Sequence, residues 1–154
     1  MKTIACIFVI ALFATLSMAA DDPFLGKWIL DVNHSHYPAG TSPASMTIEM
    51  ERAGDGVHYR SSTIYVDGRT SYAEYTANYD GNQSIVMGQR GMMLPVFLKR
   101  IDSHTVLASY TRNLQIVATS RRVVSADGLR LTITTISKTA SGTTSTTIGV
   151  YHKE

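Results

Sequence analysis

Two histidines and an aspartate stand close together near the start of the folded part of the chain. His34 and His36 are separated by one residue and Asp31 lies just before them, so two imidazoles and a carboxylate could reach one metal ion. The surrounding residues are rich in Pro, Gly and Ser, as is typical of a loop, and no thiolate or second histidine pair accompanies them. We therefore expect no metal site and no other cofactor.

The sequence holds no complete catalytic motif. It has no Gly-x-Ser-x-Gly elbow, no phosphate-binding loop, no His-Glu-x-x-His and no calcium loop. His58, His104 and His152 each stand alone, and a lone histidine in such a pattern is usually a surface residue of a strand. A haem-binding barrel would need one of them inside the barrel. We assign no catalytic residue, and an enzyme of unknown chemistry is the third of three functional hypotheses.

Tyrosine and methionine are the residue types that indicate binding. They fall on most segments of alternating apolar and polar residues, where they could line a cavity that is apolar yet offers hydroxyl groups. The alternative is that these side chains pack a solid core or brace the outer face. The candidate cavity residues are Tyr59, Tyr65, Tyr72, Tyr75, Tyr110, Tyr151, Met87, Met92 and Met93.

Alternation with turn signals recurs along the chain after Gly26, and no convincing helical period is present. Met46, Ile48 and Met50 alternate with polar residues, and Asp67-Gly68 is a two-residue hairpin signal. The pattern predicts an all-β single domain, an antiparallel up-and-down β-barrel of about 8–10 strands. An even number of strands lets the last strand pair with the first, which closes the barrel and leaves no free edge.

The stretch from Phe24 to Leu30 opens the predicted barrel. Its Phe-x-Gly-x-Trp-x-Leu pattern resembles the start of the calycins, which include the lipocalins and the intracellular fatty-acid-binding proteins. The stretch from Gly149 to Lys153 resembles the closing strand of the fatty-acid-binding proteins. Their helix pair after strand one has no counterpart here, because residues 33–44 are too few and include two prolines. The chain is therefore most similar to small exported bacterial lipocalin-like domain proteins, although it lacks the lipocalins' Thr-Asp-Tyr element.

The resemblance implies roles for residues at both ends of the barrel. Gly26 and Trp28 would close one end, and Arg121 or Arg122 would pack across the Trp28 ring, as an arginine of a late strand does in lipocalins. In fatty-acid-binding proteins an Arg-x-Tyr pair on the last strand holds the ligand carboxylate. Here Tyr151 matches the tyrosine, but Gly149 stands in place of the arginine, so fatty acid held in that way is not expected.

Positive charge gathers at the end of the predicted barrel opposite Trp28. If the strands alternate in direction, this end is the mouth of the barrel. It carries two acids, Asp31 and Asp67, and four bases, namely Arg69, Arg90, Arg112 and Lys138. A positive rim would favour ligands with an anionic head, mainly by steering them. The alternative is that these are ordinary solvated charges of turns.

Residues 1–19 have the features of a cleaved export signal. A short basic start precedes an apolar run from Ile4 to Leu16, and Ser17 and Ala19 supply the small residues for cleavage. The run is too short for a membrane span of about 20 residues, and it contains the one cysteine, Cys6. We expect a periplasmic or secreted protein whose domain is residues 20–154, monomeric and without stable membrane insertion.

The formal net charge is +2 and the basic residues are scattered, which gives no case for nucleic-acid binding. Our leading hypothesis from the sequence is an exported barrel that binds a small hydrophobic or amphiphilic molecule non-covalently, with an anionic group as one option. The alternative is an interaction or inhibitor module of the cell envelope with a filled barrel.

Overall fold

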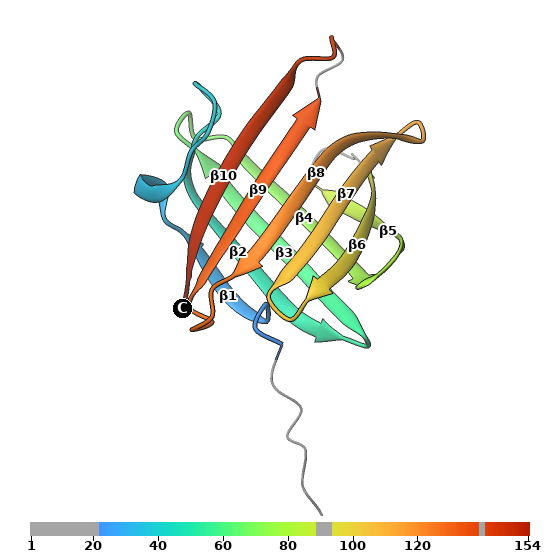
Figure 1. Ribbon diagram of the computed structural model, residues 1–154. Helices are drawn as coiled ribbons and strands as arrows, with labels where there is room; N and C mark the ends of the chain where they lie inside the picture. Colours follow the sequence, from blue (N-terminus) through green and yellow to red (C-terminus); the bar gives the residue numbers. More distant parts are fainter. Residues whose placement is uncertain (1–21, 89–93, 139–140) are drawn as a thin grey trace, which may run out of the picture.

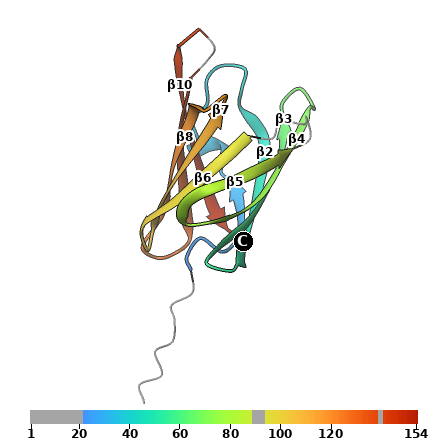
Figure 2. The same ribbon diagram turned by 90° about the vertical axis from the view of Figure 1, so that its right-hand side faces the viewer.

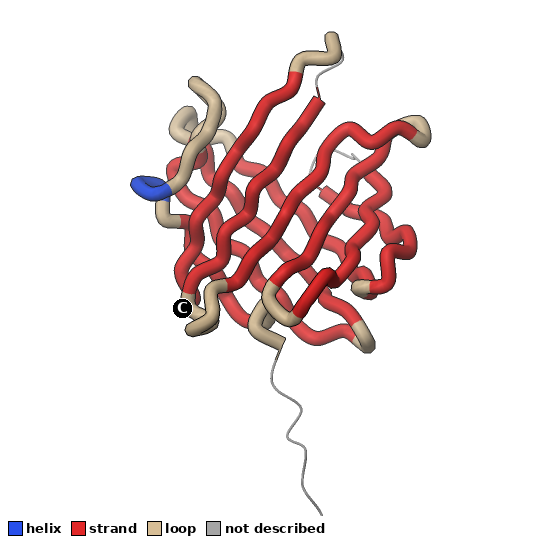
Figure 3. The backbone as a smooth tube through the Cα atoms, viewed as in Figure 1, coloured by secondary structure: helices blue, strands red, loops and turns tan. Residues whose placement is uncertain are grey.

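The computed structural model describes residues 22–88, 94–138 and 141–154. Within these residues ten antiparallel strands form one closed barrel (Figure 1). Strand makes up most of the described chain, and a short 3-10 helix, η1 (Val32–His34), lies between the first two strands (Figure 3). The strands are β1 (Gly26–Leu30), β2 (Pro43–Ala53), β3 (Gly56–Tyr65), β4 (Thr70–Asn78), β5 (Asp80–Gly88), β6 (Leu94–Asp102), β7 (Thr105–Arg112), β8 (Gln115–Val124), β9 (Arg130–Lys138) and β10 (Thr144–Lys153).

The predicted closure of an even-stranded barrel is confirmed. Trp28, Ile29 and Leu30 of β1 pair with the last strand, β10, while every other strand pairs with its neighbours in sequence. Strand β5 begins at Asp80 and lies beside β6 along one wall of the barrel (Figure 2). Its pairing with β4 is limited to Ala73 with Gly88 and Glu74 with Met87.

The turns divide between two ends of the barrel (Figure 1). At the base lie the turns that follow β2, β4, β6 and β8, together with the C-terminus. At the mouth lie the segment from η1 to β2 and the turns that follow β3 and β7. This is the arrangement that the alternation of strand direction predicts. No helix in the described ranges is long and apolar enough to cross a membrane.

The base end is packed with apolar side chains. Val57, Val106 and Val124 each lie beside a turn at the base and are at most 2% exposed. They join five other fully buried side chains, namely Trp28, Phe24, Ile48, Leu98 and Leu131. Alternation along each strand sends these side chains inward because successive Cβ atoms point to opposite faces of a sheet. The base half of the barrel is therefore a solid core.

Trp28 closes the base as the sequence predicts, but with a different cation. Its indole Nε1 donates a hydrogen bond to the Phe24 carbonyl at 2.9 Å. The Lys153 ammonium lies 5.0 Å from the centre of the indole ring and donates to the Pro23 carbonyl at 3.2 Å. Gly26 precedes Trp28 with φ of 121°, a backbone conformation that favours glycine. The first strand can therefore begin next to the last residues of the chain.

The prediction that Arg121 or Arg122 packs across Trp28 is wrong. The two residues are adjacent on β8, so they point to opposite faces of the sheet. Arg121 lies on the exposed outer face, whereas Arg122 is buried inside the barrel among tyrosines. Lys153 fills the place over the indole because β10 ends beside the start of β1.

We expect Trp28→Ala to lower the free energy of unfolding by about 3–5 kcal/mol, as for other large buried aromatic residues. The side chain is 0% exposed, so its removal leaves a cavity in the packed base and frees the Phe24 carbonyl. Val66→Ala is the control, because Val66 is 79% exposed. Chemical denaturation of both variants gives the comparison, and equal stability of Trp28→Ala and the parent would contradict the role of Trp28 in the core.

Candidate functional site

Arg122 lies on the inner face of β8, inside the barrel. Ser120, Arg122 and Val124 occupy alternate positions of this strand and are all buried, while Arg121 between them is exposed. The Arg122 guanidinium donates to the Tyr75 hydroxyl at 2.6 Å and to the Tyr110 hydroxyl at 2.9 Å. Only 3% of the residue is exposed.

Two tyrosine rings support this guanidinium. The rings of Tyr59 and Tyr75 are stacked with their centres 4.7 Å apart. The guanidinium carbon of Arg122 lies 5.1 Å from the centre of the Tyr59 ring and 5.9 Å from that of Tyr75. The negative faces of aromatic rings attract a cation, so this pair partly replaces the water that Arg122 loses on burial.

No carboxylate of the described residues pairs with Arg122. Burial raises the pKa of Tyr59 and Tyr75 above the usual range for tyrosine, so their hydroxyls stay neutral at physiological pH. An arginine side chain remains charged in proteins. Its Nε is also the one buried side-chain nitrogen or oxygen of the described residues without a hydrogen-bond partner. The interior therefore holds a positive charge that no neighbouring acid neutralises.

Arg100 at the base shows the usual alternative. Its guanidinium lies over the rings of Phe24 and Tyr79 and forms an ion pair with the Asp22 carboxylate. Burial, with Asp22 adding to the effect and Arg100 opposing it, raises the pKa of Tyr79 to about 12. The two arginines have similar aromatic surroundings, and the missing partner distinguishes Arg122.

An inner cavity of about 180 Å³ lies next to Arg122. The inner faces of β8, β9 and β10 form much of its wall through Ser120, Arg122, Ile133, Thr135, Thr147, Gly149 and Tyr151. Met46, Tyr37, Tyr59 and Tyr110 complete the lining. A Cβ atom on Gly149 would lie 2.8 Å from the Tyr151 hydroxyl oxygen, so glycine is what allows this ring to lie against the strand.

Tyr37 comes to the cavity from the segment between β1 and β2. The neighbouring residue, His36, is tied to β10 by two backbone hydrogen bonds with Ile148, of 2.7 and 2.8 Å. This bridge holds the segment against the barrel, and the half-buried Tyr37 side chain packs against the core. Burial raises the pKa of Tyr37, so its hydroxyl is neutral at physiological pH.

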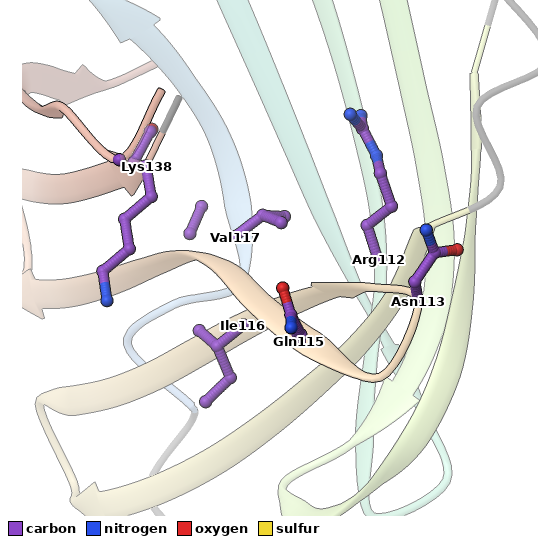
Figure 4. Close-up of a pocket in the computed structure, with 9 residues that line it drawn as sticks. Arg112, Asn113, Gln115, Ile116, Val117 and Lys138 are labelled. Atoms are coloured by element: carbon purple, nitrogen blue, oxygen red, sulfur yellow. The ribbon is translucent and has the colours of Figure 1, made fainter. Parts of the chain in front are cut away.

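A wider hollow of about 550 Å³ lies at the mouth, between the β7–β8 hairpin and the β9–β10 hairpin. We call it the notch, and it is lined by Arg112, Asn113, Gln115, Ile116, Val117, Ala118, Ser137, Lys138 and Gly142 (Figure 4). Ala118 pairs with Ser137, and residues 115–117 have no partner on the described part of β9. Ser120 and Thr135, each two residues nearer the base on its strand, line the inner cavity. The notch therefore adjoins the inner cavity.

The structure brings together some of the tyrosines selected from the sequence. Tyr59, Tyr110 and Tyr151 line the inner cavity, and Tyr75 lies beneath Arg122. Tyr65 lies at the mouth end of β3, with the Arg69 guanidinium 5.2 Å from the centre of its ring. It does not line the inner cavity.

Other candidates lie elsewhere. The prediction that Tyr72 and Met87 face the interior is wrong, because both side chains are on the outer face, 38% and 58% exposed. The Tyr72 hydroxyl instead bonds the Glu74 carboxylate. Arg69 forms an ion pair with Asp67 at the rim, and Arg112 lines the notch. Arg90, Met92 and Met93 lie outside the described residues.

Sequence reasoning missed several residues of the cavity. The sequence resemblance places Arg122 at the base, and Tyr37 lies in a segment that has no strand pattern. Ser120, Thr135 and Thr147 share the inward parity of buried neighbours such as Val124 and Tyr151, and that parity is the signal that could have identified them. Their small polar side chains are otherwise ordinary for a strand.

The histidine pair does not converge on one point. The His34 Nδ1 lies 2.7 Å from the Asp31 carboxylate, and both side chains are at the surface. Within the residues that the structure describes, no group of three or more His, Cys, Asp or Glu side chains is arranged to hold a metal ion.

Comparison with solved structures identifies the fold. The zebrafish ileal bile acid-binding protein, crystallised with cholic acid, superposes with a TM-score of 0.57 and 13% identity. The match covers 86% of this chain and 99% of that protein. With the strand order described above, it shows that the chain shares the fold of that protein, a closed ten-stranded antiparallel β-barrel. No protein-family model and no curated protein sequence matches the chain.

We expect Arg122→Met to leave the free energy of unfolding unchanged or to raise it by up to about 3 kcal/mol, since it replaces a buried unpaired charge by an apolar side chain. Arg100→Met is the matched control, because it leaves Asp22 without its partner and should destabilise the protein. Chemical denaturation measures both. A larger decrease in the free energy of unfolding for Arg122→Met than for Arg100→Met would mean that the Arg122 guanidinium stabilises the fold.

We expect a thiol at position 120 to be reached through the notch. Ser120→Cys should react with iodoacetate, and adding Ala118→Phe should slow the reaction about tenfold or more, because a ring at position 118 would fill the passage from the notch to position 120. Ser71→Phe, on the inner face of β4 at the opposite wall, is the control. Mass spectrometry follows the modification against the parent chain, and equal slowing by both rings would contradict this path.

Proposed function

We propose that this protein binds a small, partly apolar molecule with an anionic group, non-covalently and inside the barrel. The observation that carries the proposal is the Arg122 guanidinium, buried on a cavity wall with no carboxylate beside it among the described residues. A buried charge is costly unless it is paired. The anionic group of a ligand would supply the partner through charge-assisted hydrogen bonds.

The fold gives independent support by analogy. The zebrafish protein named above was crystallised with cholic acid, which combines an apolar body with a carboxylate. Fold alone does not fix function, so the argument for this chain depends on its own cavity and its own arginine. The rim adds a smaller contribution, since Lys138 and Arg112 carry positive charge at the notch.

We further propose that the protein acts outside the cytoplasm, periplasmic or secreted, as a monomer and after removal of residues 1–19. The support is the basic start, apolar run and small residues of that segment. This setting is that of the small exported bacterial lipocalin-like proteins, which the sequence as a whole resembles. Mass spectrometry of the protein purified from its host would find Ala20 at the N-terminus.

The binding proposal is tested with three ligands of one shape and different charge. We expect isothermal titration calorimetry to show 4-ethylbenzoate binding about 10–100-fold tighter than 4-ethylbenzyl alcohol or 4-ethylbenzylammonium, since a hydrogen bond to a charged group contributes about 1.5–3 kcal/mol. Arg122→Met should remove this preference. Arg122→Lys, which keeps the charge, should retain part of it.

Arg121→Met provides the matched control, because it removes the adjacent charge from the outer face of the same strand. It should leave the affinity for 4-ethylbenzoate unchanged. Equal affinity of the parent protein for all three ligands, or a preference for the anion that survives in Arg122→Met, would refute the role proposed for Arg122.

A further inference from the structure

The inner cavity is small for a barrel that binds a ligand. Its volume of about 180 Å³ lies below the range of about 300–1,000 Å³ that is typical of sites for drug-sized molecules. It corresponds to roughly six water molecules at about 30 Å³ each. The packed base cannot extend it, because Trp28, Ile48 and Leu131 are fully buried there. The space next to Arg122 therefore suits a body of about one ring, and any longer part of a ligand would have to lie in the notch.

The lining of this cavity is rich in hydroxyl groups. Four tyrosines, one serine and two threonines are among its eleven lining residues, while Met46 and Ile133 are its aliphatic side chains. A hydroxyl can both donate and accept a hydrogen bond, so such a wall suits oxygen atoms of a ligand. A long hydrocarbon chain or a steroid body would leave these groups without partners, which costs free energy when they are buried.

Several of these hydroxyls have weak or exchangeable partners. The Tyr151 hydroxyl donates to the Met46 sulfur at 3.3 Å, where the thioether is a weak acceptor, and it also interacts with the Tyr37 hydroxyl. The Ser120 and Thr135 hydroxyls bond each other at 2.6 Å, so each keeps capacity for a further bond. An oxygen of a ligand would be a better acceptor for Tyr151 than the sulfur is.

We propose that the interior site takes a single-ring acid that carries further oxygen atoms, of the class of hydroxylated benzoates. The acid group binds Arg122, the ring lies among the tyrosines, and the ring hydroxyls exchange hydrogen bonds with Tyr151 and with the Ser120–Thr135 pair. This assignment rests on the proposed function, because both need Arg122 to hold an anion. It adds a limit on size and a demand for oxygen atoms.

Calorimetry with five acids tests the assignment on the purified full-length protein. The probes are benzoate, 4-hydroxybenzoate, 3,4-dihydroxybenzoate, decanoate and cholate. We expect each ring hydroxyl to tighten binding about 3–10-fold, the effect of one ordinary hydrogen bond. We expect decanoate and cholate to bind about tenfold or more weakly than 3,4-dihydroxybenzoate, because groups left unpaired by a ligand oppose its binding.

A matched pair of variants locates the effect. Thr135→Val removes an inward hydroxyl at nearly constant volume and should weaken the binding of 3,4-dihydroxybenzoate more than that of benzoate, so that the gain from ring hydroxyls falls. Thr134→Val makes the same change at the adjacent residue, which does not line the cavity, and should alter neither. Loss of the hydroxyl gain in both variants would overturn the assignment of Thr135 to the site.

The outcomes separate this inference from the proposed function. Tighter binding of decanoate or cholate than of 3,4-dihydroxybenzoate, with dependence on Arg122, overturns the size limit and leaves the anion site standing. If ring hydroxyls do not tighten binding, the demand for oxygen atoms is overturned and the anion site still stands. If none of the acids binds, or if all bind Arg122→Met as well as the parent, both the inference and the proposed function fail.

Discussion

The guanidinium of Arg122 is held inside the barrel by neutral groups. Two tyrosine hydroxyls accept its hydrogen bonds and two stacked rings face its charge. These contacts offset part of the cost of removing an ion from water, but a neutral hydroxyl cannot cancel the charge. The remaining cost explains why the surrounding wall is polar, since aliphatic side chains there would raise it further. The chemistry of the cavity depends on this one ion.

The two halves of the barrel have different roles. The base is packed like an ordinary protein core, with Trp28 sealed by the Phe24 carbonyl and the Lys153 ammonium. Such packing contributes most of the stability of a domain, since apolar burial is the dominant favourable term in folding. The mouth half can then tolerate a hollow and a buried charge. A fold that places stability and recognition at opposite ends can change one without losing the other.

The fold was predictable because it depends on simple periodicity. Alternation along the strands and the turn signals predict the barrel, its closure and the end to which each turn belongs. The site was less predictable for a local reason. Arg121 and Arg122 are followed by Val123 and Val124, so either choice of inward face puts one valine and one arginine inside the barrel. A bulge between Tyr110 and Thr111 also shifts the pairing of β7 with β8 nearby. The position of Tyr37 depends on the bridge between His36 and Ile148, which no local sequence pattern predicts.

The pairing of β1 with β10 joins residues from opposite ends of the chain. Glu154 donates its backbone N–H to the Lys27 carbonyl at 2.9 Å, and the two side chains form an ion pair. A contact between such distant residues forms late in folding, because a long loop must close first. A chain still growing on the ribosome has no β10 at first, so the edges of β1 and β9 stay open until β10 has been synthesised. The barrel therefore cannot mature segment by segment, and a chain cut short by ten residues would expose two strand edges suited to self-association.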